Sequence, residues 1–281
     1  MPVLMGRLAL ALRVWRPKAR VAVTFHGLPF GGGHKPRNSH ISKRLERVLL
    51  RLCPPLELIF LSQRMADQMT QAMGADRLRK HRVHVLPNCS DLGDLPPAQP
   101  HSGKRLVMTG RVGWQKNYPL ATQMLAHLPS SYSLTLCGAG TDDPAFQQKL
   151  TISVPPDVAR RIHFAGPLRD VRAALMNADC YMLCSRYEGL PIGALEAFEA
   201  GLPVILSRFE GAEELAASSP YTSVLDFDDL AAGALKIDAL IAGFQSAPDD
   251  PRAAIRDHWQ RSWSPQVFRT RSRALLDKLI S

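Results

Sequence analysis

The chain has 281 residues, of which 46% are hydrophobic and 21% are charged, as in an ordinary globular protein. This length accommodates two domains, and no apolar run approaches the roughly 20 residues that a membrane-spanning helix needs. The apolar stretch in the first fifteen residues is interrupted by Arg7 and Arg13 and lacks a small-residue cleavage site. A signal peptide is therefore not expected.

The five cysteines form no C-x-x-C pair and have no histidine at zinc-site spacing. Cys137, Cys180 and Cys184 lie in or beside apolar, strand-like runs. This pattern predicts buried, reduced thiols and hence a cytoplasmic protein.

The net charge of +10 comes entirely from the first hundred residues, which hold 16 Lys and Arg against 6 Asp and Glu. The remaining residues hold equal numbers of both signs. A one-sided basic surface suggests an anionic partner, either a membrane face, a phosphorylated substrate or a nucleic acid. The alternative is a solvated basic helix without a partner, such as "SKRLERVLLR".

The first hundred residues contain three predicted strands, at 21–25, 56–62 and 83–87. Helical patterns surround them at 4–15, 40–52 and 63–73. This arrangement resembles the second half of a Rossmann-like domain. The Pro-, Gly- and Ser-rich segment 88–104 is predicted to be the interdomain linker.

From residue 104 onward, apolar strands alternate with helical segments, which indicates a parallel sheet covered on both faces. Six strands are predicted, at 105–110, 133–138, 161–166, 179–185, 203–207 and 222–227. Helices are predicted at 118–128, 168–178 and 192–200, and one or two more in the tail at 253–280. The expected organisation is a partial N-terminal domain (1–98), a complete Rossmann-like domain (99–245) and terminal helices that pack back on the body (246–281).

The segment "SRYEGLPIGALEAFEAGLPVILS" (185–207) links two of these strands through a loop and a helix that ends at Gly201. Pro191 suits the first helical position. In open α/β sheets ligands bind beyond the carboxyl ends of strands, and the free N–H groups of 190–193 would attract a diphosphate there. Glu196, one turn into the helix, can accept two hydrogen bonds from the hydroxyls of a ribose. Glu188 would face what lies beyond the phosphates.

A diphosphate site also needs cations, and "GRVGWQKN" (110–117) supplies Arg111 and Lys116 at the end of the first strand of this domain. The next two strands end in "CGAG" (137–140) and "FAGPLRD" (164–170). Glycines there allow close approach of the backbone to a ligand.

Together, "TGRVGWQKN", "LCGAG", "IHFAGPLRD", "LMNADCYMLCSRYEGLPIGALEAFEAGLPVI" and "GAEEL" resemble the C-terminal domain of group 1 glycosyltransferases (glycosyltransferase family 4, GT-B fold). The resemblance covers about residues 20–215 and is strongest from 104 to 214. It implies two Rossmann-like domains, the N-terminal one truncated. It also implies retaining, metal-independent transfer of a sugar from a nucleotide diphosphate sugar, with no other cofactor.

The resemblance assigns catalytic roles to Glu188, Arg111, Lys116 and His26, the last in "VAVTFHGL". Donor-binding positions are Glu196, Gly110, Gly138, Gly140, Gly166, Gly189, Leu190, Pro191 and Ile192. "PNCSD" corresponds to the usual family "PNGVD", with Asn88 kept and Cys89 in place of the glycine.

The strands and Gly-rich loop that open the family's N-terminal domain have no counterpart before "VAVTFHG". Either the true start lies upstream, or the missing half comes from another chain, or the protein has lost part of its acceptor site. The truncated form would expose a sheet edge and an apolar face, which predicts poor solubility or oligomerisation. The predicted acceptor is a saccharide or a lipid-linked saccharide, in surface polysaccharide or glycolipid synthesis, at the inner face of the cell membrane. The alternative is a non-catalytic nucleotide-sugar-binding remnant. Nucleic-acid binding rests on the basic residues alone and is not predicted.

Two further motifs are interpreted without a catalytic role. "GGGH" (31–34) is expected to be an acceptor-side loop. The pairs Asp142-Asp143 and Asp228-Asp229 fall in predicted loops without further ligands, and no metal site is expected there.

Overall fold

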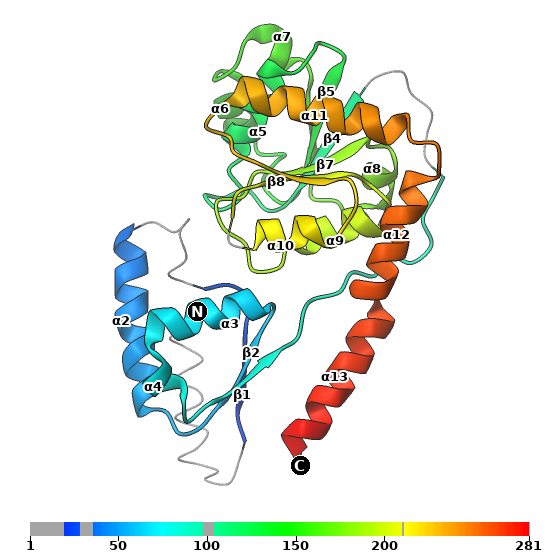
Figure 1. Ribbon diagram of the computed structural model, residues 1–281. Coiled ribbons are helices and arrows are strands. Elements are labelled where there is room, and N and C mark those ends of the chain that lie inside the picture. The colour runs from blue at the N-terminus through cyan, green and yellow to red at the C-terminus, as the bar shows by residue number, and fades with distance from the viewer. Residues whose placement is uncertain (1–19, 29–35, 98–103, 210, 281) are drawn as a thin grey trace. The chain divides into compact units, whose positions relative to one another are not determined.

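The computed structural model describes residues 20–28, 36–97, 104–209 and 211–280. The chain divides into two compact units, and Figure 1 shows the elements of each. The N-terminal unit takes in residues 1–89, 187–190 and 265–281, and the C-terminal unit takes in 90–186 and 191–264. The predicted helix at 4–15 and the GGGH loop lie outside the described residues.

The N-terminal unit contains a parallel sheet in the order β1-β2-β3, and its strands are the three that the sequence predicted. Its strands are β1 (Ala22–Phe25), β2 (Glu57–Phe60) and β3 (Arg82–Val85). Its helices are α2 (Pro36–Leu52), α3 (Gln63–Met73), α4 (Ala75–Leu78) and α13 (Pro265–Ile280).

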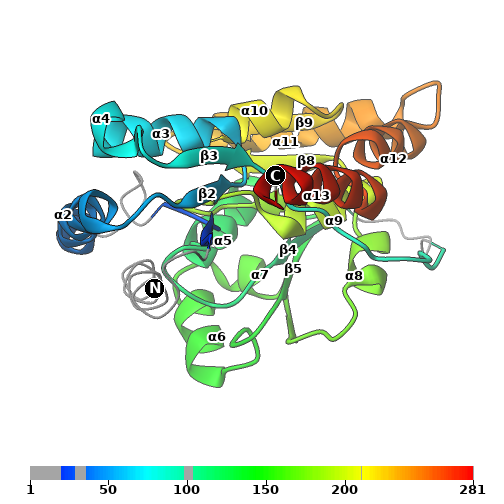
Figure 2. The same ribbon diagram turned by 90° about the horizontal axis from the view of Figure 1, so that it is seen from below.

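The core of this unit forms on one face of the sheet. Leu58 and Phe60 of β2 are completely buried, and the Phe60 ring stacks on Phe25 with centroids 5.0 Å apart. Methionines of α3 at helical spacing, among them Met69 and Met73, fill the space above them. Figures 1 and 2 both show α3 beside these strands. Alternation along the strands thus accounts for the buried face.

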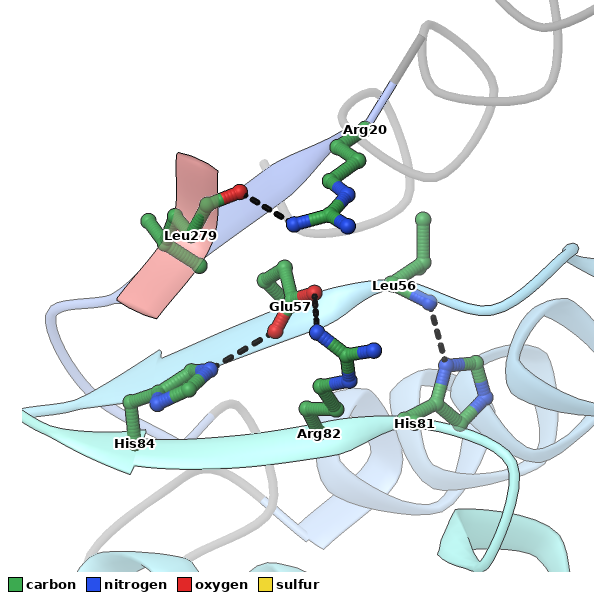
Figure 3. Close-up of polar contacts among 7 residues, drawn as sticks. All are labelled: Arg20, Leu56, Glu57, His81, Arg82, His84 and Leu279. Carbon is green, nitrogen blue, oxygen red and sulfur yellow. Dashed lines mark hydrogen bonds and ion pairs between the residues drawn. The ribbon is translucent and has the colours of Figure 1, made fainter. Parts of the chain in front are cut away.

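A buried histidine, His81, connects the residue before β2 with α2, and Figure 3 shows its bond to Leu56. His81 Nδ1 accepts a hydrogen bond from the Leu56 N–H at 3.1 Å, and Nε2 lies 3.0 Å from the Leu50 carbonyl oxygen. Because Nδ1 accepts, Nε2 carries the hydrogen. Burial is the main cause that lowers the pKa of His81, so the ring is neutral at pH 7.

The other face of the sheet is polar. Glu57 is 7% exposed, and its carboxylate lies 2.7 Å from His84 Nε2 and 3.4 Å from Arg82 Nη1 (Figure 3). Arg20, just before β1, donates to the carbonyl of Leu279 in α13 at 2.5 Å. These contacts connect β1, β2, β3 and α13 within the unit.

The C-terminal unit contains a six-stranded parallel sheet in the order β6-β5-β4-β7-β8-β9. The strands are β4 (Lys104–Thr109), β5 (Tyr132–Cys137), β6 (Ile162–Gly166), β7 (Cys180–Leu183), β8 (Val204–Ser207) and β9 (Thr222–Leu225). The helices are α5 (Tyr118–His127), α6 (Pro144–Thr151), α7 (Pro156–Ala159), α8 (Arg172–Met176), α9 (Ile192–Glu199), α10 (Ala212–Ala217), α11 (Leu230–Gln245) and α12 (Pro251–Ser262).

Each predicted strand of this sheet is confirmed, and their order is that of a doubly wound Rossmann fold. In Figure 1, α5, α6 and α11 lie on one side of the sheet and α9 and α10 on the other. The central strands β7 and β8 are buried at every position and therefore lack polar alternation, whereas β6 and β9 at the edges are partly exposed. On the α9 side, α12 packs against α9, and Trp263 stacks on Phe198 at 5.4 Å.

Several local expectations can be compared with the structure. Cys137, Cys180 and Cys184 are buried free thiols, as predicted, and burial raises the pKa of Cys137 to about 11. Asp143 and Asp229 cap the N-termini of α6 and α11 by accepting backbone N–H bonds. None of the described helices is long and apolar enough to cross a membrane.

Candidate functional site

The candidate site of the C-terminal unit lies where the strand order reverses. β4 and β7 are neighbours, although β5 and β6 intervene in the chain, so the loops after them open side by side. The Arg186 N–H donates to the Gln115 carbonyl at 2.8 Å and joins these two loops directly. Ligands of open α/β sheets bind at such a switch point.

Glycines let the loop backbones of β4, β5 and β6 approach each other closely. A Cβ built on Gly138, whose φ is +142°, would lie 1.9 Å from the Gly110 carbonyl oxygen. The Gly138 N–H donates to the Gly166 carbonyl at 2.7 Å, and Gly140 lies against Val112. The predicted donor-binding glycines of these three strands are therefore adjacent, and no larger residue fits at Gly138.

Lys116 lies across Gly110. A Cβ on Gly110 would be 2.5 Å from Lys116 Cε, so this glycine provides the space that the lysine side chain occupies. Arg111 is exposed in the same loop, one residue after Gly110. The loop thus presents both predicted cations at the carboxyl end of β4.

Helix α9 follows β7 after the loop 184–191, and its first turn packs closely on the sheet. Pro191, with φ −72° and ψ 111°, is the N-cap residue, one position before its predicted place, because its backbone is extended rather than helical. A Cβ on Gly193 would lie 2.3 Å from the Tyr181 hydroxyl and 2.5 Å from Thr109 Oγ1. Sequence reasoning missed Gly193, although a glycine in the first turn of a helix signals such an approach.

Glu196 is partly buried on α9, and its pKa is raised to about 7. Burial is the main cause, the nearby Glu199 carboxyl adds to it, and the positive charge of Lys116 opposes it. Within the described chain, no hydrogen bond or ion pair holds this carboxylate. A desolvated carboxyl close to a lysine at a sheet switch point is typical of a ligand site.

Two other predicted catalytic residues belong to the N-terminal unit. Residues 187–190, which include Glu188, Gly189 and Leu190, group with this unit. A Cβ on Gly189 would lie 2.2 Å from the His26 carbonyl oxygen, so the loop backbone rests on the end of β1. His26 is exposed, and Glu188 is partly buried. The Gly-Leu-Pro turn therefore needs glycine for packing as well as for any contact with a ligand.

The "PNCSD" segment is held partly by Trp259 and Glu199, which the sequence did not single out. Asn88 Nδ2 donates to the Leu190 carbonyl at 3.1 Å within the N-terminal unit. In the C-terminal unit, Trp259 Nε1 donates to Ser90 Oγ at 2.8 Å, and Glu199 accepts the Leu92 N–H at 2.7 Å. Glu199 is 5% exposed, so the second glutamate of "LEAFEA" anchors the linker.

Among the described residues, no three His, Cys, Asp or Glu side chains are grouped as a metal site would require. The site supplied by this part of the chain consists of cations, backbone amides and one carboxyl group with a raised pKa.

Comparison with known proteins identifies the family of this chain. Residues 103–242, which contain the six strands, match the family model described as "Glycosyl transferases group 1". The chain belongs to the group 1 glycosyl transferases. A glycogen synthase of Mycobacterium tuberculosis is 32% identical over 209 residues, which cover 71% of this chain and 47% of the relative. The chain thus spans about half the length of this group 1 relative.

Solved structures show the same fold. A sucrose-phosphate synthase from Thermosynechococcus elongatus superposes with a TM-score of 0.81 at 17% identity, covering 98% of this chain and 71% of that protein. Anabaena HepE, solved in complex with UDP and glucose, gives a TM-score of 0.77 at 17% identity over 96% and 74%. The predicted GT-B fold is confirmed.

Proposed function

We propose that the protein is a retaining, metal-independent glycosyltransferase that moves a sugar from a nucleotide diphosphate sugar to a saccharide or lipid-linked acceptor. The observation that carries the proposal is the switch point of the C-terminal unit. There, Lys116 lies across Gly110 and near Glu196, at the beginning of α9. The UDP complex of HepE makes UDP-glucose the first donor to test.

The chemistry follows from the charges. Breaking the anomeric bond transfers negative charge to the departing diphosphate. Arg111, Lys116 and the first N–H groups of α9, around Leu190–Ile192, would stabilise that charge as it develops. The ionised Glu196 carboxylate would accept hydrogen bonds from the ribose hydroxyls. Bound nucleotide would favour the ionised form of Glu196 and lower its pKa.

The roles proposed for the N-terminal unit come from the family resemblance. His26 and Glu188 would contact the donor sugar. The departing phosphate itself would accept the proton of the attacking hydroxyl, so no separate base is required. The acceptor hydroxyl would attack the anomeric carbon from the face that the diphosphate leaves. The product would therefore keep the anomeric configuration of the donor.

The first experiment is a thermal-shift panel with UDP, GDP, ADP and CDP on the wild-type chain. A nucleotide at 100 times its dissociation constant stabilises the native state by about 2.7 kcal/mol. One nucleotide should raise the midpoint by several degrees, and Glu196→Ala should abolish the shift. Glu214→Ala, at an exposed glutamate of α10, is the control and should keep it. Absence of a shift with every nucleotide would contradict the proposal.

Turnover distinguishes an enzyme from a non-catalytic remnant that binds nucleotide sugars. Release of the nucleotide from its matching sugar donor, in the presence of acceptor saccharides, should require Lys116 and Glu188. Lys116→Ala and Glu188→Gln should each lower the rate by at least about 100-fold. Nucleotide binding without turnover on any acceptor would favour the remnant, acting with a partner chain.

We further propose that the protein works in the cytoplasm against the inner face of the membrane. Arg44, Arg51, Val48 and Leu52 are exposed along α2, the last two at 52% and 67%. An exposed helix face that combines arginine with aliphatic side chains suits an anionic bilayer surface. Basic residues at 77, 79 and 80 line a hollow with Arg51 and with Asp76, which pairs with Arg79, so the lining is positive on balance.

Vesicle co-sedimentation tests this proposal. Phosphatidylglycerol vesicles should retain the protein at low salt and release it as salt rises, and neutral vesicles should not retain it. Leu52→Ser combined with Arg44→Gln should reduce binding by about tenfold. Arg160→Gln, at an exposed arginine of the C-terminal unit, is the charge control. An equal loss in both variants would show that only net charge matters.

A further inference from the structure

A second hollow of the C-terminal unit lies beside the loop 110–117, which carries Arg111 and Lys116 of the candidate donor site. It has a volume of about 460 Å³ and lies between the loop after β4, the first turn of α5 and the helix α6. Figure 1 shows α5 and α6 on the face of the sheet opposite α9, which carries Glu196. The size is in the range of small-molecule pockets.

The walls of this hollow are largely aromatic and aliphatic. The Tyr118 and Phe146 rings meet edge to face at 5.6 Å, and Val112 packs beside them. Trp114, at the mouth, is 52% exposed. An apolar surface of this kind gains free energy when a ligand removes it from water.

Positive charge converges on the same hollow. The Arg186 guanidinium lies 3.9 Å from the centre of the Trp114 ring, and its Nη2 donates to Asn117 Oδ1 at 2.6 Å. Arg186 Nε is shielded from solvent and has no acceptor among the described residues. Lys149 is exposed at the rim, and none of the described lining residues is acidic.

Arg186 and Lys149 both line the hollow, and their positive charges attract an anion more strongly in a partly desolvated site than in water. The stack on Trp114 and the bond to Asn117 hold the guanidinium in place, so binding costs little side-chain entropy. A purely inorganic ion is not the best ligand, because it would gain nothing from the apolar walls. They equally disfavour a neutral saccharide, whose hydroxyls would find few partners there.

We propose that this hollow is a second ligand site, for a small amphiphilic anion: an apolar chain or ring that carries one carboxylate or phosphate. The apolar part contacts Tyr118, Phe146 and Val112, and the anionic group binds Arg186 and Lys149. The site shares the loop 110–117 with Arg111 and Lys116, and its remaining walls come from α5, α6 and Arg186. The proposal does not depend on the glycosyltransferase activity.

Calorimetry with decanoate and decanol, both below the concentrations at which they aggregate, tests the site. Decanoate should bind with one-to-one stoichiometry and at least about tenfold more tightly than decanol. Lys149→Gln should weaken decanoate about fivefold and leave decanol unchanged. Ser153→Trp, which places an indole at an exposed lining position, should abolish binding of both.

Lys236→Gln, at an exposed lysine of α11 outside the hollow, is the matched control and should bind decanoate like the wild type. Equal affinities for decanoate and decanol, or equal losses in the two lysine variants, would overturn the proposal. So would binding that survives Ser153→Trp. Vesicle binding should be unaffected by Ser153→Trp. If it falls, the hollow takes a membrane lipid rather than a dissolved anion.

Discussion

Each unit of this protein contains a titratable group whose pKa is shifted by burial, but the two groups differ in their hydrogen-bond partners. His81 in the N-terminal unit is buried, and both ring nitrogens have backbone partners. Glu196 in the C-terminal unit is also desolvated, yet no hydrogen bond holds its carboxylate within the described chain. His81 is part of the scaffold, and the proposed function gives the Glu196 carboxylate a ligand. For these two groups, the hydrogen bonds differ more clearly than the burial does.

The largest effect is expected from the scaffold of the C-terminal site. Gly138→Ala would place Cβ 1.9 Å from the Gly110 carbonyl and require an L-residue at φ +142°. The loop backbones would have to separate, at a cost of about 3 kcal/mol or more. Thermal unfolding should show a midpoint lower by about 6–12 °C. Gly113→Ala, in the same loop region with open space around its Cβ, should unfold like the wild type.

The next effect concerns His81. His81→Ala leaves the Leu56 N–H and the Leu50 carbonyl buried without partners, which should cost about 2 kcal/mol. Amide hydrogen exchange of β2 should accelerate by about 30-fold. His127→Ala, at an exposed histidine of the C-terminal unit, should leave that exchange unchanged.

The same histidine sets a pH dependence. Because the folded pKa lies below the ordinary 6.5, the unfolded chain binds more protons as the pH falls. The N-terminal unit should therefore lose stability on acidification below pH 6.5, and His81→Ala should remove this part of the slope. An unchanged slope in the variant would assign the acid sensitivity to other groups.

The sequence predicted the sheets well because their strands are apolar runs bounded by glycine and proline. β7, for example, lies in "DCYMLCS", between a polar turn and the Gly-Leu-Pro loop. The predicted helix at 168–178 is shorter in the structure and begins at Arg172. Its N–H is accepted by the Asp170 carboxylate, which forms a turn in place of the first helical residues.

What the sequence could not show are the contacts between chain segments far apart. No role was assigned to Glu199 from the sequence, and only the fold brings the Leu92 N–H to it across 107 positions. Gly193 likewise has no local reason to be glycine, because Tyr181 and Thr109 come from other strands. Helix α11 was not predicted, since its alanine-rich sequence has little amphipathic contrast. The raised pKa of Glu196 also depends on packing that no spacing reveals.

The smallest expected change in stability, that of Glu196→Gln, tests the contrast between Glu196 and His81 most directly. Glu196→Gln removes a carboxyl whose pKa is raised from 4.5 to about 7 by burial. Between these pH values the folded state binds the extra proton, so stability of the wild-type C-terminal unit falls as pH rises and is then constant above pH 7. The variant lacks this loss. It should match the wild type near pH 4.5 and exceed it by about 1 kcal/mol at pH 8, after allowance for solvent screening.

The nucleotide that shifts the wild-type midpoint should reverse that order at pH 8. Binding would stabilise the wild type, because the ionised carboxylate accepts hydrogen bonds from the ribose. Glu196→Gln should bind the same nucleotide at least about tenfold more weakly and should gain correspondingly less stability. Glu214→Gln should change neither measurement. If Glu196→Gln were less stable than the wild type at pH 8 without ligand, the carboxylate would be a satisfied structural group like His81. Glu196 and His81 would then not differ in hydrogen bonding, and the contrast drawn between the two units would be wrong.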